Sequence, residues 1–164
     1  MNRTNLIFLF IPLTTVCTNV FAQFRQWESV VVPGQPWMYT IPNGANADWT
    51  VLNFDDSSWL EGNSGIGYGD NDDNTVISPT VALFMRKKFE IQDLSLISRA
   101  VLDIDYDDGF VAYLNGHEVA RSYNLSDPGT FVPFDETTSY DHEASLYQGG
   151  FPENILLDSL LLDS

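Results

Sequence analysis

Short runs of β-branched and aromatic residues, bounded by Gly, Pro, Asn and Asp, recur along the chain from residue 29 onward. No segment keeps a helical period over a long stretch, whereas the alternation of apolar and polar positions is typical of half-buried strands. The pattern predicts strands at 29–32, 38–41, 80–90, 99–106, 110–114 and 118–122. Helical character is expected only in short turns at 57–59 and 94–97. The sequence therefore predicts an all-β fold.

The stretch 100–122 contains the clearest local signals. Residues 102, 104 and 106 are apolar or aromatic, while the positions between them include Asp103 and Asp105, so one face of this strand is expected to be buried. Further along, Asn115 and Gly116 are suited to the positive φ angles of a type I′ turn. The strand that follows is therefore expected to pair back antiparallel as a hairpin.

Two long polar segments, 53–75 and 124–150, separate these runs. Insertions of this size in a compact β domain are expected to be binding or metal loops, or to wrap the edge of the sheets. The chain ends on two apolar triplets, 155–157 and 160–162, separated by Asp158 and Ser159.

The N-terminus has the pattern of a secretory signal peptide. Arg3 precedes an apolar run from Leu6 to Leu13, and Val20-Phe21-Ala22 places small residues before a cleavage point. The run is too short, and too interrupted, for a transmembrane helix. We therefore expect residues 1–22 to be a signal peptide, residues 23–164 to form one domain, and the protein to be secreted or at the cell surface.

The chain carries 23 acidic and 7 basic residues, a formal net charge of −16, and a single cysteine, Cys17, which lies in the predicted leader. Such a surface is expected to repel nucleic acids and anionic membranes, and to suit cations, neutral sugars or basic partners. We expect no nucleic-acid partner, and no membrane insertion after signal cleavage. The simpler explanation of the charge is solubility.

Several blocks of sequence resemble a known module when taken in order. They are Trp49 followed by Phe-Asp-Asp-Ser-Ser-Trp at 54–59, Gly-Ile-Gly-Tyr-Gly-Asp-Asn-Asp-Asp at 65–73, Arg-Lys-Lys-Phe at 86–89, and the stretch 105–121. Asp-His-Glu-Ala at 141–144 and Gly-Gly-Phe-Pro-Glu at 149–153 agree as well. Together they resemble a galactose-binding-like jelly-roll module of secreted bacterial multidomain proteins, found N-terminal to CotH kinase-like, lamin-tail or metallophosphatase domains.

The resemblance implies a jelly-roll β-sandwich that binds carbohydrate in many proteins and serves as a spacer in others. In the similar modules, the stretch like 160–162 is followed by a Gly-x-Asn turn and one more apolar strand, both of which this chain stops short of. We therefore expect the module at 23–164 to be incomplete at its C-terminus, with downstream domains of the same polypeptide as partners.

The richest cluster of oxygen ligands is the Gly-bounded run that contains Asp70, Asp72 and Asp73. Calcium takes six to eight oxygen ligands, and acidic residues in such a loop can supply several of them. The run lacks the spaced glutamate of an EF-hand. We expect either a structural calcium site or a solvated acidic loop.

Four residues are candidates for carbohydrate binding. Asp107 and Asp108 either cap the turn before Gly109 or point toward a sugar. Trp37 and Tyr68 are candidate stacking platforms for the apolar face of a pyranose. Two further tryptophans, Trp49 and Trp59, are expected to belong to the core.

Nothing in the sequence singles out a catalytic set. Glycosidases need two carboxyl groups at a set separation, and 23 acidic residues offer too many pairs to discriminate. His117 and His142 are expected to be structural. The sequence predicts a non-catalytic accessory module of a larger extracellular protein that binds a polysaccharide or glycan. The alternative is an inert spacer that positions a downstream kinase-like or hydrolase domain.

Overall fold

The computed structural model describes residues 26–44, 48–69, 72–158 and 161–162. The signal peptide predicted at 1–22 lies outside the described residues. The domain boundary at residue 23 and the incompleteness of the C-terminal end stay predictions.

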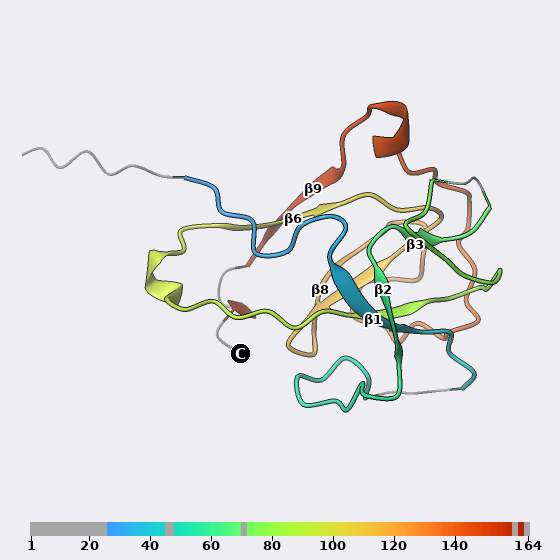
Figure 1. Ribbon diagram of the computed structural model, residues 1–164, viewed down its shortest axis with the longest axis horizontal. Helices are drawn as coiled ribbons and strands as arrows, with labels where there is room; N and C mark the ends of the chain where they lie inside the picture. The colour runs from blue at the N-terminus through green and yellow to red at the C-terminus, as the bar shows by residue number, and fades with distance from the viewer. Residues whose placement is uncertain (1–25, 45–47, 70–71, 159–160, 163–164) are drawn as a thin grey trace, which may run out of the picture.

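The all-β prediction is confirmed, since the described elements are strands and two short 3-10 turns (Figure 1). A three-stranded antiparallel sheet has the order β2-β1-β5 and is formed by Leu60–Asn63, Pro36–Thr40 and Phe84–Arg86. The other sheets are pairs: parallel β3 (Ile66–Gly67) with β4 (Thr75–Val76), and antiparallel β6 (Ala100–Ile104) with β9 (Glu153–Leu157) and β7 (Val111–Leu114) with β8 (His117–Arg121). The 3-10 turns are η1 (Leu94–Leu96) and η2 (Leu146–Gln148).

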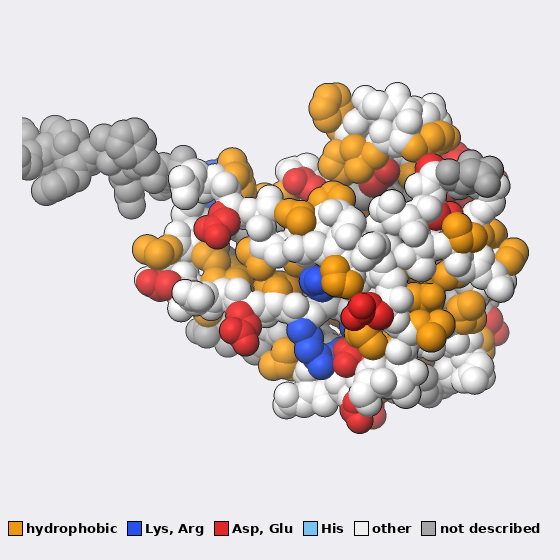
Figure 2. Space-filling view, in the orientation of Figure 1, with side chains coloured by type: hydrophobic (Ala, Val, Ile, Leu, Met, Phe, Trp, Pro, Cys, Tyr) orange, Lys and Arg blue, Asp and Glu red, His pale blue; other side chains and the backbone are white. Residues whose placement is uncertain are grey.

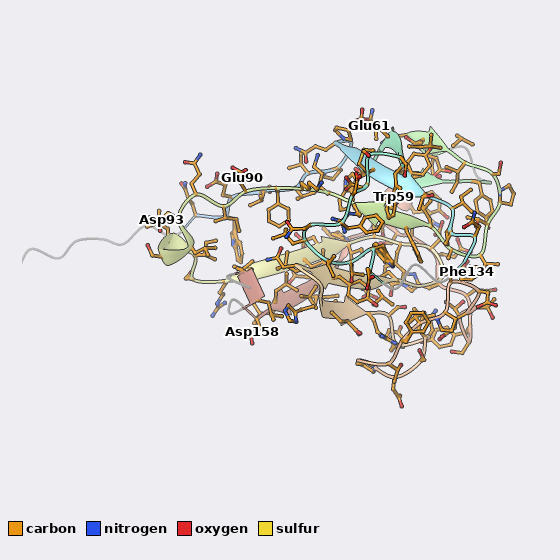
Figure 3. The ribbon with its side chains drawn as sticks, turned by 90° about the horizontal axis from the view of Figure 1, so that it is seen from below. Trp59, Glu61, Glu90, Asp93, Phe134 and Asp158 are labelled. Carbon is orange, nitrogen blue, oxygen red and sulfur yellow. The ribbon has the colours of Figure 1, made fainter. Side chains whose placement is uncertain are left out.

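These sheets lie on two sides of the molecule. In Figure 3, β1, β2 and β5 lie on one side, whereas β6, β9 and the β7–β8 hairpin lie on the other. Aromatic side chains connect the two sides: Trp49 stacks on Phe84 of β5 with ring centroids 4.4 Å apart, and meets Tyr113 of β7 edge-on at 5.8 Å. Trp59 packs against Phe54 at 5.5 Å. Trp49 and Trp59 therefore pack where the sequence predicted core residues.

The predicted hairpin is confirmed. Asn115 and Gly116 have φ angles of 51° and 89°, and Leu114 pairs with His117 across the turn. Positive φ at both central residues matches the right-handed twist of the flanking strands, which is why this dipeptide closes the hairpin. A register shift at Ala112 and Tyr113 marks a β-bulge.

Two strand predictions and one loop prediction were wrong. Residues 29–32 form no strand, and the strand expected at 80–90 is limited to Phe84–Arg86. The segment 53–75, expected to be one long loop, contains β2, β3 and Thr75, the first residue of β4. β2 has the sequence Leu-Glu-Gly-Asn and no apolar alternation, so its strand conformation comes from pairing with β1 and not from its own residues.

Few apolar side chains are buried. Among the described residues, the buried apolar residues are Pro42 and, each 9 % exposed, Tyr39 and Tyr106, while Leu156 of β9 is 65 % exposed. Within these residues no helix is long and apolar enough to cross a membrane.

A largely buried arginine side chain fastens the segment 48–59 to β5. Arg86 Nε donates to Asp56 Oδ2 at 3.0 Å, and its other nitrogens donate to the carbonyls of Trp49 and Leu52. Lys88 Nζ reaches the second carboxylate oxygen of Asp56 at 3.1 Å. Burial raises the pKa of Asp56, but the hydrogen bonds from Arg86 and Lys88 outweigh this effect and the pKa lies below its usual value.

A second arginine organises the loop after β8. The Arg121 side chain is 2 % exposed and holds Glu118 with two bonds of 2.8 Å. Its remaining donors reach the carbonyls of Ser126 and Thr130, each at 2.8 Å. The planar guanidinium has five donors, so one side chain can satisfy an acid and two loop carbonyls together.

We expect Arg86→Leu to lower the free energy of unfolding by about 3–5 kcal/mol, because it leaves a buried carboxylate with only one cationic partner. Urea unfolding measures this value. The matched control is Arg99→Leu, which removes an exposed arginine from the same chain. Equal losses for the two variants would contradict a special role for Arg86.

Candidate functional site

Three tyrosines converge beside the end of β6. Tyr106 follows β6, Tyr123 lies two residues beyond β8, and Tyr140 lies in the long loop before β9. We call this group the tyrosine cluster. It is bordered by Asp108, from the turn between β6 and β7, and by Glu153 at the start of β9.

Two rings of the cluster are open to solvent. Tyr123 is 76 % exposed and Tyr140 is 45 % exposed, and their ring centroids lie 5.8 Å apart at an interplanar angle of 43°. Partial burial and then the neighbouring Tyr123 hydroxyl raise the pKa of Tyr140. The two rings therefore form a tilted aromatic surface that is accessible and has closely spaced hydroxyl groups.

Asn124 fixes this surface in place. Its side chain is buried, and Nδ2 donates to the carbonyls of Asp108 at 2.6 Å and Tyr140 at 2.9 Å. The Asn124 carbonyl accepts from the Ser139 amide at 2.8 Å. The Asn124 side chain, which directly follows Tyr123 in the chain, thus links the turn at Asp108 to Tyr140.

Tyr106, the third member of the tyrosine cluster, is buried. Its hydroxyl donates to Glu153 Oε1 at 3.0 Å, and its ring stacks on His142 with centroids 4.2 Å apart. His142 Nδ1 lies 3.0 Å from the Tyr106 carbonyl, and His142 Nε2 lies 3.8 Å from Glu153. The packed position of His142 agrees with the structural role expected for it.

The three acids around the β6–β7 turn have different roles. Asp105 accepts from the amides of Ser145 and Leu146, and Asp107 Oδ1 accepts from the Ala144 amide at 2.7 Å. These two carboxylates hold the segment that leads into η2, so Asp107 bonds to backbone of a distant loop and not to the turn before Gly109 that the sequence hypothesis named.

Asp108 differs from its neighbours. Its backbone is left-handed, with φ of 59°, and its amide donates to the His142 carbonyl at 2.7 Å. Its side chain is on the surface, and within the part of the chain that the structure describes it accepts no hydrogen bond. Both carboxylate oxygens of Asp108 are therefore available to accept hydrogen bonds from a ligand.

Gly109 lets the turn approach the loop closely. A Cβ at this position would lie 2.7 Å from Thr138 Cγ2 and 2.9 Å from Ser122 Oγ, so a larger residue would push the turn away. Ser122 Oγ accepts from the Phe110 amide at 3.0 Å, which closes the contact. The close approach keeps Asp108 beside the cluster.

The structure places the other predicted sugar-binding residues elsewhere. Trp37 is a half-buried residue of β1 on the same face as buried Tyr39, and its Nε1 has no hydrogen-bond partner among the described residues. Tyr68 follows β3, is 45 % exposed, and donates its hydroxyl to the Thr80 carbonyl. No ring contact or hydrogen bond in the described ranges joins either residue to Asp107 or Asp108.

The predicted calcium loop is described in part. Asp70 lies outside the described residues, Asp72 is exposed, and Asp73 is half-buried with its carboxylate against Gly67. Among the described residues, no group of three or more His, Cys, Asp or Glu is arranged to hold a metal ion. Calcium binding at this loop stays a prediction.

Sequence reasoning missed Tyr123 and Tyr140. The two lie 17 positions apart in a segment without periodicity, and they meet because Asn124 bonds to backbone on both sides. A signal was present in the Tyr-Asn pair directly after a hairpin strand, since a polar residue there can fasten the return loop.

Neither a scan against protein-family models nor searches of curated proteins and of solved structures found a match. The resemblance to galactose-binding-like modules therefore stays a prediction.

Tyr106 gives the site a pH signature. Burial, followed by the hydrogen bond and charge of Glu153, raises its pKa to about 12. Its contribution to stability is therefore present below about pH 10, where an unfolded tyrosine titrates, and is lost as the pH rises through about 12. We expect the urea midpoint to fall across this range, and to fall less for Tyr106→Phe. Identical pH profiles for the two proteins would contradict this assignment.

Proposed function

We propose that the chain is a secreted, non-catalytic accessory module that binds carbohydrate at the tyrosine cluster. The observation that carries the proposal is the exposed Tyr123–Tyr140 pair, which Asn124 links to the backbone of the turn that bears Asp108. Strands on two sides of the molecule support a jelly-roll β-sandwich as the architecture of this module (Figure 3).

The pair has the chemistry that a sugar ring requires. The C–H face of a pyranose is apolar, and its burial against a tyrosine ring is favourable. Tyrosine hydroxyls and the Asp108 carboxylate can exchange hydrogen bonds with sugar hydroxyls at the edge of the ring. The rings set the orientation of the sugar, and the polar groups select among hydroxyl patterns.

The framework lowers the cost of binding. Asn124 and Gly109 fix the backbone on both sides of the pair, so little conformational entropy is lost when a ligand arrives. Glu153 is engaged with Tyr106 and His142, and its role in the proposal is to support the rings, not to transfer protons.

We expect the full chain to be retained by at least one neutral polysaccharide in affinity electrophoresis, and Tyr123→Ala or Tyr140→Ala to weaken binding at least about tenfold through lost ring contacts. The matched control is Trp27→Ala, which removes a 74 % exposed aromatic ring near the N-terminal end of the described chain. Circular dichroism verifies that each variant is folded.

Two outcomes would count against the proposal. Equal retention of Trp27→Ala and Tyr123→Ala would show nonspecific adsorption to exposed rings. Absence of retention across a broad polysaccharide panel would favour the spacer alternative.

A further inference from the structure

A second feature lies on the other side of the molecule, at the sheet formed by β2, β1 and β5. A cavity of about 210 Å³ is lined by backbone and side chains of β1, by Asp56 and Glu61, and by three consecutive cationic residues, Arg86, Lys87 and Lys88. Figure 3 places Glu61 on the outer side of this sheet, away from β6 and β9.

The cation content of this cavity is unusual for the chain. It holds three of the seven Lys and Arg residues of a protein whose net charge is −16. Figure 2 shows Lys and Arg side chains gathered near the middle of this face, with Asp and Glu side chains beside them. A local positive site within a negative surface attracts a single carboxylate at short range, while the overall charge repels polyanions.

The three cations are not equivalent. Arg86 is largely buried, and it bonds to Asp56 and to the carbonyls of Trp49 and Leu52. Lys87 Nζ donates to the Pro36 carbonyl at 2.8 Å, and Lys88 Nζ donates to Asp56 at 3.1 Å. An ammonium group has three donors, so each lysine is positioned by one bond and keeps two donors for a ligand.

The remaining walls suit the other parts of a sugar. Pro36, Trp37 and Met38 supply apolar surface, and the exposed Glu61 supplies an acceptor for hydroxyl groups. The volume is smaller than the roughly 300–1,000 Å³ of sites for larger ligands, so the cavity fits one compact unit.

We propose that this cavity binds the carboxylate of an acidic sugar, a uronic acid, through Lys87 and Lys88. The carboxylate meets the two ammonium groups, the ring lies along the apolar wall, and ring hydroxyls donate to Glu61. The choice of a sugar over other carboxylates rests on the proposed carbohydrate function, whereas the requirement for a carboxylate rests on the cavity alone.

Titration of the full chain, followed by the NMR signals of the amides of Met38 and Glu61, tests the proposal. Glucuronate and galacturonate are the probes, glucose and galactose are their neutral counterparts, and acetate and serine are carboxylates without a sugar ring. We expect saturable shifts with a uronate and weaker binding at higher salt. Equal affinity for glucose would overturn the role of the carboxylate, and equal affinity for acetate or serine would overturn the sugar assignment.

Variants test the residues. Lys87→Gln with Lys88→Gln should weaken uronate binding by about tenfold or more through the loss of charge-assisted bonds, and Lys87→Arg should retain most of the affinity. Arg99→Gln makes the charge change of one lysine variant at an exposed position outside the cavity and should bind as the wild type does. An equal loss in Arg99→Gln would overturn the site.

The two sites fail independently. The lysine variants should keep their retention on neutral polysaccharide, because neither lysine belongs to the tyrosine cluster. If the double variant does not fold, the uronate affinity of Lys87→Gln alone tests the site. This variant should fold, since Lys87 makes one bond to a surface carbonyl. Uronate binding without any neutral polysaccharide binding would refute carbohydrate binding at the tyrosine cluster while supporting the lysine site.

Discussion

The fold depends on a few buried polar side chains that each satisfy several backbone groups of a loop. The buried apolar residues in the described part of the chain are Tyr39, Pro42 and Tyr106, so burial alone does not fasten the long connections. Arg86 holds the segment 48–59, Arg121 holds the loop after β8, and Asn124 holds the return from residue 140. Loss of such a group leaves partners buried without bonds, which costs more than the bond itself contributes to stability.

The candidate site follows from the same constraint. An exposed aromatic pair on a mobile loop would have to be ordered by its ligand, at a cost in entropy. Here the Asn124 amide fixes the backbone at Asp108 and Tyr140, while Asp105 and Asp107 anchor the adjoining segment at 144–146. Near the β6–β7 turn, Asp105 and Asp107 therefore hold the backbone, whereas the Asp108 side chain faces solvent.

Sequence reasoning succeeded where structure is local. The all-β class and the Asn115–Gly116 hairpin depend on alternation and on two backbone angles, which neighbouring residues determine. It failed for β2, whose strand conformation comes from pairing with β1, and for the valines at 29–32, which form no strand. Asp107 and Asp108 were both selected as candidates from the sequence. Only the structure shows that Asp107 accepts from a backbone amide, whereas the Asp108 side chain is on the surface. The tyrosine pair depends on one long-range amide contact, which no local pattern encodes.

Hydrogen exchange of the native protein, read by NMR at single amides, tests the central claim most directly. The amides of Ser126 and Ser145 lie in loops but donate to Glu136 and Asp105, so we expect them to exchange slowly, like strand amides. The amide of Asp135 makes no hydrogen bond in the described part of the chain and should exchange near the rate of a free peptide. Exchange of Ser126 and Ser145 as fast as that of Asp135 would contradict the account, because the loops would then not be held by their polar anchors.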